Sequence, residues 1–211
     1  MHQAAEVARR LLEIKAVKLR PRDPFTWASG ILSPIYCDNR VALSYPAVRT
    51  FLKNCLAEQA AEFGAFDCVA GVATAGIAHG ALLADKLNLP FVYVRGSAKD
   101  HGRRNLIEGE VSPGQRVLVV EDLISTGGSC IAAAEALRDA GCEVVGVLAI
   151  FQYGFEKAKS AFAAQNLRFA TLTDYHALVL EAAKTGYIDT QDQQTLEQWR
   201  RNPEGWGALY A

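Results

Sequence analysis

The residues of this chain that are best suited to chemistry follow an apolar stretch near its middle. Residues 117–120 are uncharged and mostly β-branched, and they lead directly into an acidic pair, Glu121 and Asp122. The chain then becomes small and polar through Ser125 and Thr126 to two adjacent glycines, before a segment with helical periodicity. A strand, a glycine-containing turn and a helix start expose free backbone N–H groups at the positive end of the helix dipole. We therefore predict a phosphate site in this turn.

The acidic pair distinguishes this turn from the common nucleotide-binding loops. No Lys follows Gly128, so the turn is not a Walker loop, and its glycines lack the G-x-G-x-x-G spacing of a dinucleotide site. A phosphate site normally avoids carboxylates, so the two acids must face a different group. A ribose diol would suit them, because carboxylates accept hydrogen bonds from hydroxyls. The alternative is that the acids cap the helix and the glycines only allow a tight turn.

Residues 119–129, V-V-E-D-L-I-S-T-G-G-S, resemble the phosphoribosyl diphosphate signature of the type I phosphoribosyltransferases. In that family the acids bind the ribose hydroxyls of the donor, and the loop after them binds its 5′-phosphate. Residues 72–77 resemble the family's diphosphate-binding turn. The resemblance therefore implies that the donor is bound by Glu121, Asp122, Leu123, Ile124, Ser125, Thr126, Gly127, Gly128 and Ser129, together with Thr74 and Ala75.

Further segments resemble the orotate phosphoribosyltransferases within that family. The segments similar to their N-terminal hood, which in one bacterial subgroup reads F-T-W-A-S-G, are residues 25–30 and 33–40. The segments similar to their mobile catalytic loop are residues 93–95, 99–102 and 107–109. The likeness covers roughly residues 25–155. It implies that the chain transfers a phosphoribosyl group to orotate, in the synthesis of UMP.

Two other functions stay open at this point. The chain could be a phosphoribosyltransferase for a purine or another base, or a non-catalytic regulator that keeps the donor site and senses the donor. The hood and the catalytic loop favour orotate over another base. A regulator of this kind usually carries a DNA-binding region, and the sequence shows no basic helix-turn-helix pattern.

The basic residues of the expected catalytic loop suit the reaction that the resemblance implies. Diphosphate leaves C1 of the sugar through a transition state with oxocarbenium character, so positioning and charge stabilisation dominate the catalysis. We expect Asp122 at the sugar, and Arg95, Lys99 and His101 where the leaving group gathers negative charge. Mg²⁺ is the expected cofactor, held mainly through the donor's oxygens rather than by protein ligands. A closing loop would also exclude water, whereas the alternative is a solvated basic loop.

The chain departs from the family mainly at positions where charged side chains are common. Lysines of other members are replaced by Ala28, Leu32, Ala75 and Gly96, and an Arg after the fifth strand is replaced near Gln152 and Tyr153. For the orotate carboxylate we nominate Arg40 and the backbone around Tyr36 and Cys37. Ser125 stands where the family places a hydroxyl residue against the base.

Three further residues attract attention by their type. His79 falls in the helix expected after the diphosphate turn, and a helical His near an apolar face is more often structural than functional. Trp199 and Trp206, near the C-terminus, are expected to pack in a core or an interface rather than to stack on a base.

The elements that must position these residues follow from hydrophobic periodicity. Helices are expected over residues 4–17, 46–63 with Gly64 as a stop, 75–87 and 127–140, then a short one after 155 and two starting at Asp174 and Thr190. Strands are expected at 25–28, 35–37, 67–73, 90–94, 116–120, 143–151 and 169–171. Continuous apolar strands between helices indicate an α/β fold with a mostly parallel central sheet flanked by helices. The resemblance makes this the type I phosphoribosyltransferase fold with a small N-terminal hood. Residues 96–115 lack periodicity and are expected to form a loop.

The 211 residues are expected to form one domain, with the hood at about 1–45, the core at about 46–155 and C-terminal helices at about 156–211. A net charge of −1 gives no reason to expect a nucleic-acid partner. The five cysteines are scattered without a C-x-x-C pair, so we expect free thiols and a cytoplasmic protein. We expect neither a signal peptide nor a membrane span. The resemblance implies small-molecule substrates, orotate and the phosphoribosyl diphosphate donor, and a homodimer in which the mobile loop completes the neighbour's site.

Overall fold

Continuous apolar strands form the centre of the structure. The structure is a computed structural model, and it describes residues 2–27, 30–96 and 106–207. The strands of the main sheet are β5 (Cys68–Val72), β6 (Phe91–Val94), β7 (Ile107–Glu108), β8 (Arg116–Ile124), β9 (Glu143–Gln152) and β10 (Phe169–Asp174). Their order is β10-β9-β8-β5-β6-β7. Neighbouring strands run parallel except β7, which is antiparallel to β6. The expected α/β fold with a mostly parallel sheet is therefore confirmed.

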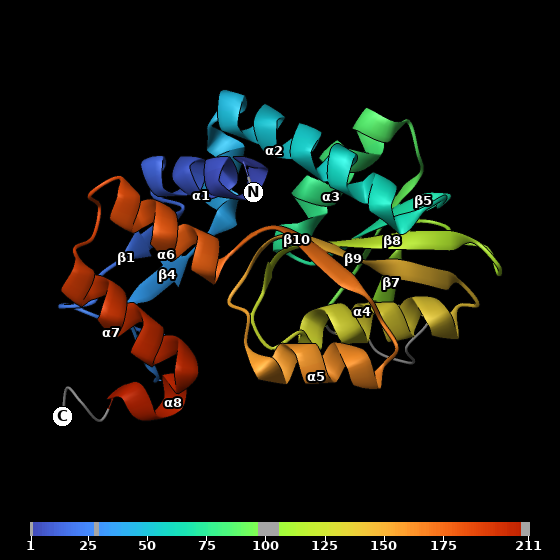
Figure 1. Cartoon of the computed structure of the whole chain (residues 1–211). Coiled ribbons are helices and arrows are strands. Elements are labelled where there is room, and N and C mark those ends of the chain that lie inside the picture. The colour runs from blue at the N-terminus through green and yellow to red at the C-terminus, as the bar shows by residue number, and fades with distance from the viewer. Residues whose placement is uncertain (1, 28–29, 97–105, 208–211) are drawn as a thin grey trace.

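Helices cover both faces of this sheet, because the central strands are apolar on both sides (Figure 1). One face carries α1 (His2–Glu13), α2 (Pro46–Ala60) and α3 (Ala75–Leu87), and the other carries α4 (Gly128–Asp139) and α5 (Glu156–Ala164). Two clusters of buried hydrophobic residues fill the two spaces between the sheet and the helices. None of the described helices is long and apolar enough to cross a membrane.

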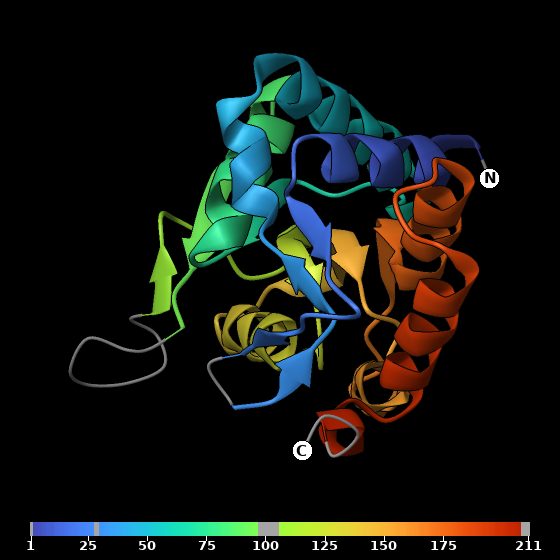
Figure 2. The ribbon, with the colours of Figure 1, turned by 90° about the vertical axis from the view of Figure 1, so that its left-hand side faces the viewer.

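The N-terminal hood and the C-terminal helices lie side by side at one end of the sheet (Figure 1, Figure 2). The hood contains two short antiparallel pairs, β1 with β4 and β2 with β3, followed by a 3-10 helix. Its elements are β1 (Val17–Leu19), β2 (Phe25–Thr26), β3 (Leu32–Ser33), β4 (Ile35–Cys37) and η1 (Asn39–Ser44). The C-terminal elements are α6 (Tyr175–Lys184), α7 (Thr190–Arg201) and α8 (Pro203–Trp206).

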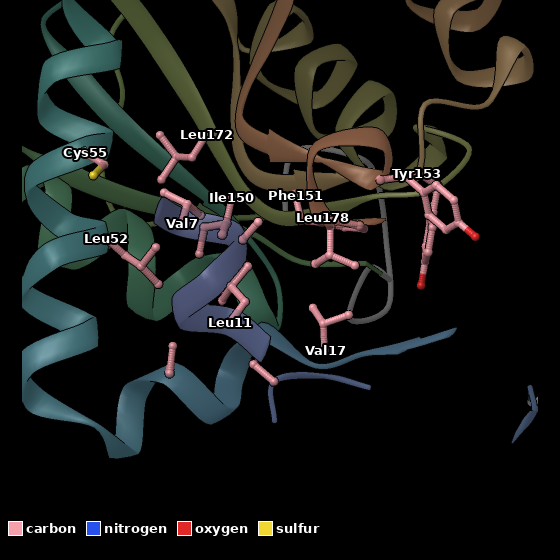
Figure 3. Packing of buried hydrophobic residues seen from close by; sticks show 14 of the residues in the cluster. Val7, Leu11, Val17, Leu52, Cys55, Ile150, Phe151, Tyr153, Leu172 and Leu178 are labelled. Carbon is pink, nitrogen blue, oxygen red and sulfur yellow. The ribbon is translucent and has the colours of Figure 1, made fainter. Parts of the chain in front are cut away.

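One hydrophobic core joins the N-terminal, central and C-terminal parts of the chain. Figure 3 shows side chains of α1, α2, β9 and α6 that point toward one another, among them Val7, Leu52, Ile150 and Leu178. The amphipathic pattern of α1 buries Val7 and Leu11 in this core, as its spacing predicts. Burial at about 25 cal/mol per Å² of apolar surface makes this shared core the main source of stability.

The start and end of several elements differ from the expectation. The first helix ends at Glu13, not at residue 17, because Val17 begins strand β1 and pairs with Cys37 of β4. Strand β2 ends at Thr26, before the expected end at residue 28. By contrast, α2 begins at Pro46, and a 3-10 turn, η2 (Ala61–Phe63), leads to Gly64 with a φ of 76°, so the expected stop is confirmed.

The C-terminal half shows further differences. The acid-bearing strand β8 continues to Ile124, past the expected end at residue 120, because β9 pairs with it as far as that residue. The stretch 96–115 contains β7, which the sequence pattern missed because the strand has only two residues. Helix α6 is capped by Asp174 as expected, whereas the cap of α7 is Asp189 rather than Thr190.

Candidate active site

The carboxyl ends of β5 and β8 lie side by side at the point where the order of strands in the sheet reverses. From β5 the chain passes outward to β6 on one side, and later to β8 on the other side. Helix α3 follows β5 and helix α4 follows β8, so both helices begin at the carboxyl edge of adjacent strands and lie on opposite faces (Figure 1). Ligands of open α/β sheets bind in the crevice at such a reversal point. A cavity of about 320 Å³ lies there.

The turns after β5 and β8 form the walls of this cavity. The first turn contributes Ala73, Thr74 and Ala75, and the second contributes Glu121, Asp122, Leu123, Ser125, Thr126, Gly127, Gly128 and Ser129. The structure thus brings together two segments that the sequence separates by more than forty positions. Within these two turns Ile124 is the exception among the expected donor-binding residues, since its side chain is buried in the core instead.

Both helices that begin at the cavity have uncapped N-termini. The Thr74 side chain makes no capping hydrogen bond at the start of α3, and Gly127, at the start of α4, has no side chain that could cap its helix. The first backbone N–H groups of both helices are therefore available to an anion, and each helix dipole adds positive potential there. The cavity therefore borders two helix N-termini that are suited to an anion.

Gly127 allows the backbone conformation of the second turn. Its φ of +85° lies in the left-handed region, and a Cβ atom there would come 2.7 Å from Cε2 of Phe162. A Cβ on Gly128 would meet nothing within 4 Å. The turn therefore needs glycine at 127 for its backbone, whereas Gly128 leaves open space beside the helix N-terminus.

The acidic pair lines the same cavity as the two helix N-termini. Glu121 is 5% exposed; its Oε1 accepts a hydrogen bond from the Asp122 backbone N–H at 2.9 Å, and its Oε2 accepts one from the Ser129 hydroxyl at 3.2 Å. Burial and the neighbouring Asp122 charge raise the pKa of Glu121, and burial raises the pKa of Asp122. Neither acid caps α4, so the capping alternative is wrong. Both acids line the cavity, and their carboxylate oxygens have lone pairs left to accept hydrogen bonds from a hydroxyl-bearing ligand.

Asn39 connects the hood to this pair, a contact that the sequence did not reveal. The side chain of Asn39 is fully buried, and its Nδ2 donates to the backbone carbonyl of Asp122 at 2.8 Å. Its Oδ1 accepts from the Cys37 thiol at 3.5 Å. The buried His79 makes a hydrogen bond with the backbone of Asn39, which partly offsets the burial that lowers the pKa of His79 to about 4. His79 is thus neutral, and its place in the packed interior fits the structural interpretation.

Arg95 lies beside the first turn. It lines a second cavity of about 580 Å³ together with Thr74, which also borders the cavity with the acids. Its guanidinium donates to Glu108 of β7 at 3.3 Å. Lys99 and His101 lie outside the described residues.

Of the residues nominated for the acceptor, Tyr36, Cys37 and Arg40 lie in the hood, and Ser125 lies in the turn after β8. Ser125 borders the acid-containing cavity and also a neighbouring cavity of about 490 Å³, whereas Tyr36, Cys37 and Arg40 line neither. Arg40 instead pairs with Asp38 through two hydrogen bonds of 2.7 and 2.9 Å.

The tryptophans pack as expected. Trp199 is fully buried, and its ring contacts Trp27, Tyr153, Phe155 and Tyr175. Trp206 is also buried. The five cysteines are free thiols.

Comparison with known proteins gives consistent matches to one family. The model of the phosphoribosyl transferase domain matches residues 42–173. An orotate phosphoribosyltransferase of Porphyromonas gingivalis is 54% identical over 202 residues, which are 95% of this chain and 96% of that protein.

Solved structures agree with this match. The crystal structure of orotate phosphoribosyltransferase from Aeropyrum pernix is 30% identical, with a TM-score of 0.75, over 87% of this chain and 99% of that one. The Mycobacterium tuberculosis orotate phosphoribosyltransferase in complex with 5-phospho-α-D-ribosyl 1-diphosphate is 27% identical, with a TM-score of 0.66, over 83% of this chain and 98% of that one.

Proposed function

The chain belongs to the orotate phosphoribosyltransferases of the phosphoribosyl transferase family, with their type I fold, and we propose that it makes orotidine 5′-phosphate for UMP synthesis. In this reaction a ring nitrogen of orotate bonds to C1 of 5-phospho-α-D-ribose 1-diphosphate and loses its proton. The bond from C1 to the diphosphate oxygen breaks, and diphosphate leaves with the electron pair. A purine acceptor and a non-catalytic sensor are not favoured by these relatives.

One observation carries the proposal: the buried Glu121 and the half-buried Asp122 line a single cavity together with two uncapped helix N-termini. The donor has the same arrangement of charge, with a phosphate at one end, a diphosphate at the other and a ribose with hydroxyl groups between them. The start of α4 suits the 5′-phosphate, and the turn at Thr74 and Ala75 suits the diphosphate. Glu121 and Asp122 suit the ribose hydroxyls, because carboxylates are acceptors.

The 5′-phosphate is held mainly by the backbone. The N–H groups from Ser125 to Ser129, with the hydroxyls of Ser125 and Thr126, would donate to its oxygens, while Leu123 and Ile124 contribute only through their backbone. Hydrogen bonds to a charged partner are worth about 1.5–3 kcal/mol each, so three or four would hold the donor firmly. The open space beside Gly128 leaves room for a phosphate close to the helix.

Catalysis is assigned to charges at the two sides of the breaking bond. Asp122 places negative charge beside the sugar, where oxocarbenium character develops. Arg95, Lys99 and His101 are proposed to stabilise the negative charge that gathers on the departing diphosphate. Arg95 is suited to this because it borders the turn at Thr74.

Mg²⁺ is proposed as the cofactor. Among the described residues no group of three or more His, Cys, Asp or Glu side chains could hold a metal ion by itself. The two adjacent carboxyl groups fit an ion that takes most of its ligands from donor oxygens and water, as Mg²⁺ does at phosphate sites. When bound, Mg²⁺ would reduce the negative charge of the diphosphate.

The acceptor is proposed to bind beside Ser125, under the hood. Tyr36 and Cys37 belong to β4, whose neighbour Asn39 reaches the backbone of Asp122. Arg40 is the candidate that the sequence offers for the orotate carboxylate, although its guanidinium is paired with Asp38.

We further propose a cytoplasmic homodimer in which the loop with Lys99 and His101 completes the partner's site. The free thiols of all five cysteines support a reducing compartment. The small-molecule substrates are orotate and the donor.

The proposed function is tested by an initial-rate assay. Protein, Mg²⁺ and donor are mixed with orotate, and the loss of orotate absorbance is followed, with omission of Mg²⁺ and of donor as controls. We expect turnover that requires the donor and is strongly reduced without Mg²⁺. Turnover of a purine base with none of orotate would contradict the proposal.

A further inference from the structure

A cavity of about 490 Å³ adjoins the proposed donor site and has no role in the function as described so far. Ser125 and Thr126 line both cavities, so these two residues separate the proposed donor site from the second space. The other walls come from the hood, from the segment after β9 and from the end of α7. A planar acceptor that must reach C1 of the donor would fit in this space.

Aromatic contacts fix the walls of this acceptor cavity. Trp27 of the hood and Phe155 line it, and the buried Trp199 contacts both, with ring centroids 5.6 and 5.8 Å away. The indole Nε1 of Trp199 also donates to the backbone carbonyl of Leu32 at 3.3 Å. The last turn of α7 is therefore attached to the hood and to the segment after β9 at once, and the next residue, Arg200, has a defined position.

The acceptor cavity is rich in cations. Lys157, Arg200 and Arg201 line it, whereas one of its two acids, Glu156, is paired with Lys159 at 2.7 Å. Arg200 is held in place by a hydrogen bond of 3.2 Å from its Nη1 to the backbone carbonyl of Gly154. No ion pair of Arg200 is found within the part of the chain that the structure describes. A guanidinium has five N–H donors, so most of them remain available to a ligand.

We propose that Arg200 binds the carboxylate of the acceptor and so selects a carboxylate-bearing pyrimidine. This inference rests on the proposed function, because the acceptor is taken to be orotate. A guanidinium fork matches the geometry of a carboxylate. Arg40 is less suited, because Asp38 already occupies its fork and it does not line the acceptor cavity.

The inference is tested with Arg200→Gln, Arg200→Lys and Arg40→Gln in steady-state assays with orotate and donor. We expect Arg200→Gln to raise the KM for orotate about 10- to 100-fold, which is the loss of one charged hydrogen-bonded pair. The KM for the donor should stay within about twofold of the unmodified protein. Arg200→Lys keeps the charge but loses the paired N–H donors of the guanidinium. Its KM for orotate should therefore lie between those of the unmodified protein and Arg200→Gln.

Arg22→Gln serves as the matched control. Arg22 pairs with Asp189 and Asp192 at the opposite end of α7 and lines neither cavity. It should leave both KM values unchanged, which separates a contact with the acceptor from a general loosening of the helix. Thermal melting of each variant checks that it is folded, and Arg200→Lys keeps the test decisive if Arg200→Gln does not fold.

The outcomes separate this inference from the proposed function. An orotate KM within about twofold of normal in Arg200→Gln, or a rise in Arg40→Gln instead, overturns the role of Arg200 while the proposed function stands. An equal rise of both KM values in Arg200→Gln overturns the selective role as well. An unmodified protein that does not turn over orotate overturns the proposed function, and the role of Arg200 with it.

Discussion

Glu121 is buried and Asp122 is half-buried, so keeping both of them charged is costly for the fold. Taking a carboxylate out of water disfavours its charged form, and the raised pKa values of both acids reflect this. Residues that are retained at the expense of stability are typical of functional sites. The same two acids are thus expected to lower stability and to be required for activity.

Asp122→Asn should separate these two effects. The amide keeps the shape and removes the charge, so the free energy of unfolding at neutral pH should be unchanged or higher, while kcat/KM for the donor falls about 100-fold or more. Urea unfolding and initial rates measure the two quantities. Asp85→Asn, on the exposed surface of α3, is the control and should change neither. A variant that loses stability and activity together would contradict this account of the pair.

His79 provides a second prediction at the residue scale. Its pKa is lowered by burial to about 4, so between about pH 6.5 and 4 the unfolded chain binds a proton that the folded protein does not. The free energy of unfolding should therefore fall as the pH is lowered through this range, by a few kcal/mol at most. His79→Gln lacks this titration, so the difference in stability between the two proteins should change across the range. A difference that is constant from pH 8 to 4.5 would show that His79 does not titrate in this way.

Residue types in one continuous run were readable from the sequence, whereas contacts across the fold were not. The acidic pair, the hydroxyls and the glycines are adjacent, so their joint chemistry could be predicted. Asn39 and the carbonyl of Asp122 are 83 positions apart, and Arg200 is 46 positions from Gly154. A polar side chain on its own gives no sign of such a partner, which is why both residues emerged only from the structure.

At the scale of elements, the start of α4 depends on two glycines with different tasks. Gly127→Ala should destabilise the protein by about 2 kcal/mol or more, because φ is +85° and the added Cβ would approach Phe162. Gly128→Ala is the matched control. Its Cβ would meet nothing within 4 Å, so stability should be unchanged or slightly higher. Urea unfolding of both variants tests this difference, and equal losses would contradict it.

The elements were predicted well where the hydrophobic pattern extends over many residues. They were predicted poorly where a strand has only two or three residues and depends on pairing with another strand. Helix α3 begins and ends as expected, and β5, β8 and β9 were all found. Strand β1 has only three residues and depends on pairing with β4, so local pattern favoured an extension of the first helix. Tertiary pairing overrode that preference, as it often does at the ends of elements.

At the scale of the whole molecule, the core supports the proposal of a single domain. Buried residues from α1, α2, the sheet, α6 and α7 belong to one cluster, and Figure 3 shows part of it. The hood and the C-terminal helices therefore share their packing with the sheet that carries the proposed site. This sharing explains how Arg200, near the end of the chain, can line the same cavity as Ser125.

The proposed homodimer leads to a complementation experiment. Asp122→Asn and Lys99→Ala should each be nearly inactive alone, since they remove the sugar contact and a loop cation respectively. If the loop acts in the partner's site, half of the dimers formed at random are mixed and each has one intact site, which gives roughly a quarter of normal activity. Activity that stays at the level of the single variants would show that the loop acts within its own chain.

A competition experiment determines which base the protein uses as its acceptor. Orotate, adenine, hypoxanthine and guanine are supplied together at equal concentrations with Mg²⁺ and a limiting amount of donor, and the nucleotides formed are separated and identified. We expect orotidine 5′-phosphate as the nucleotide product, in equal amount to the diphosphate released. A purine nucleotide, or diphosphate released without any nucleotide, would contradict this expectation.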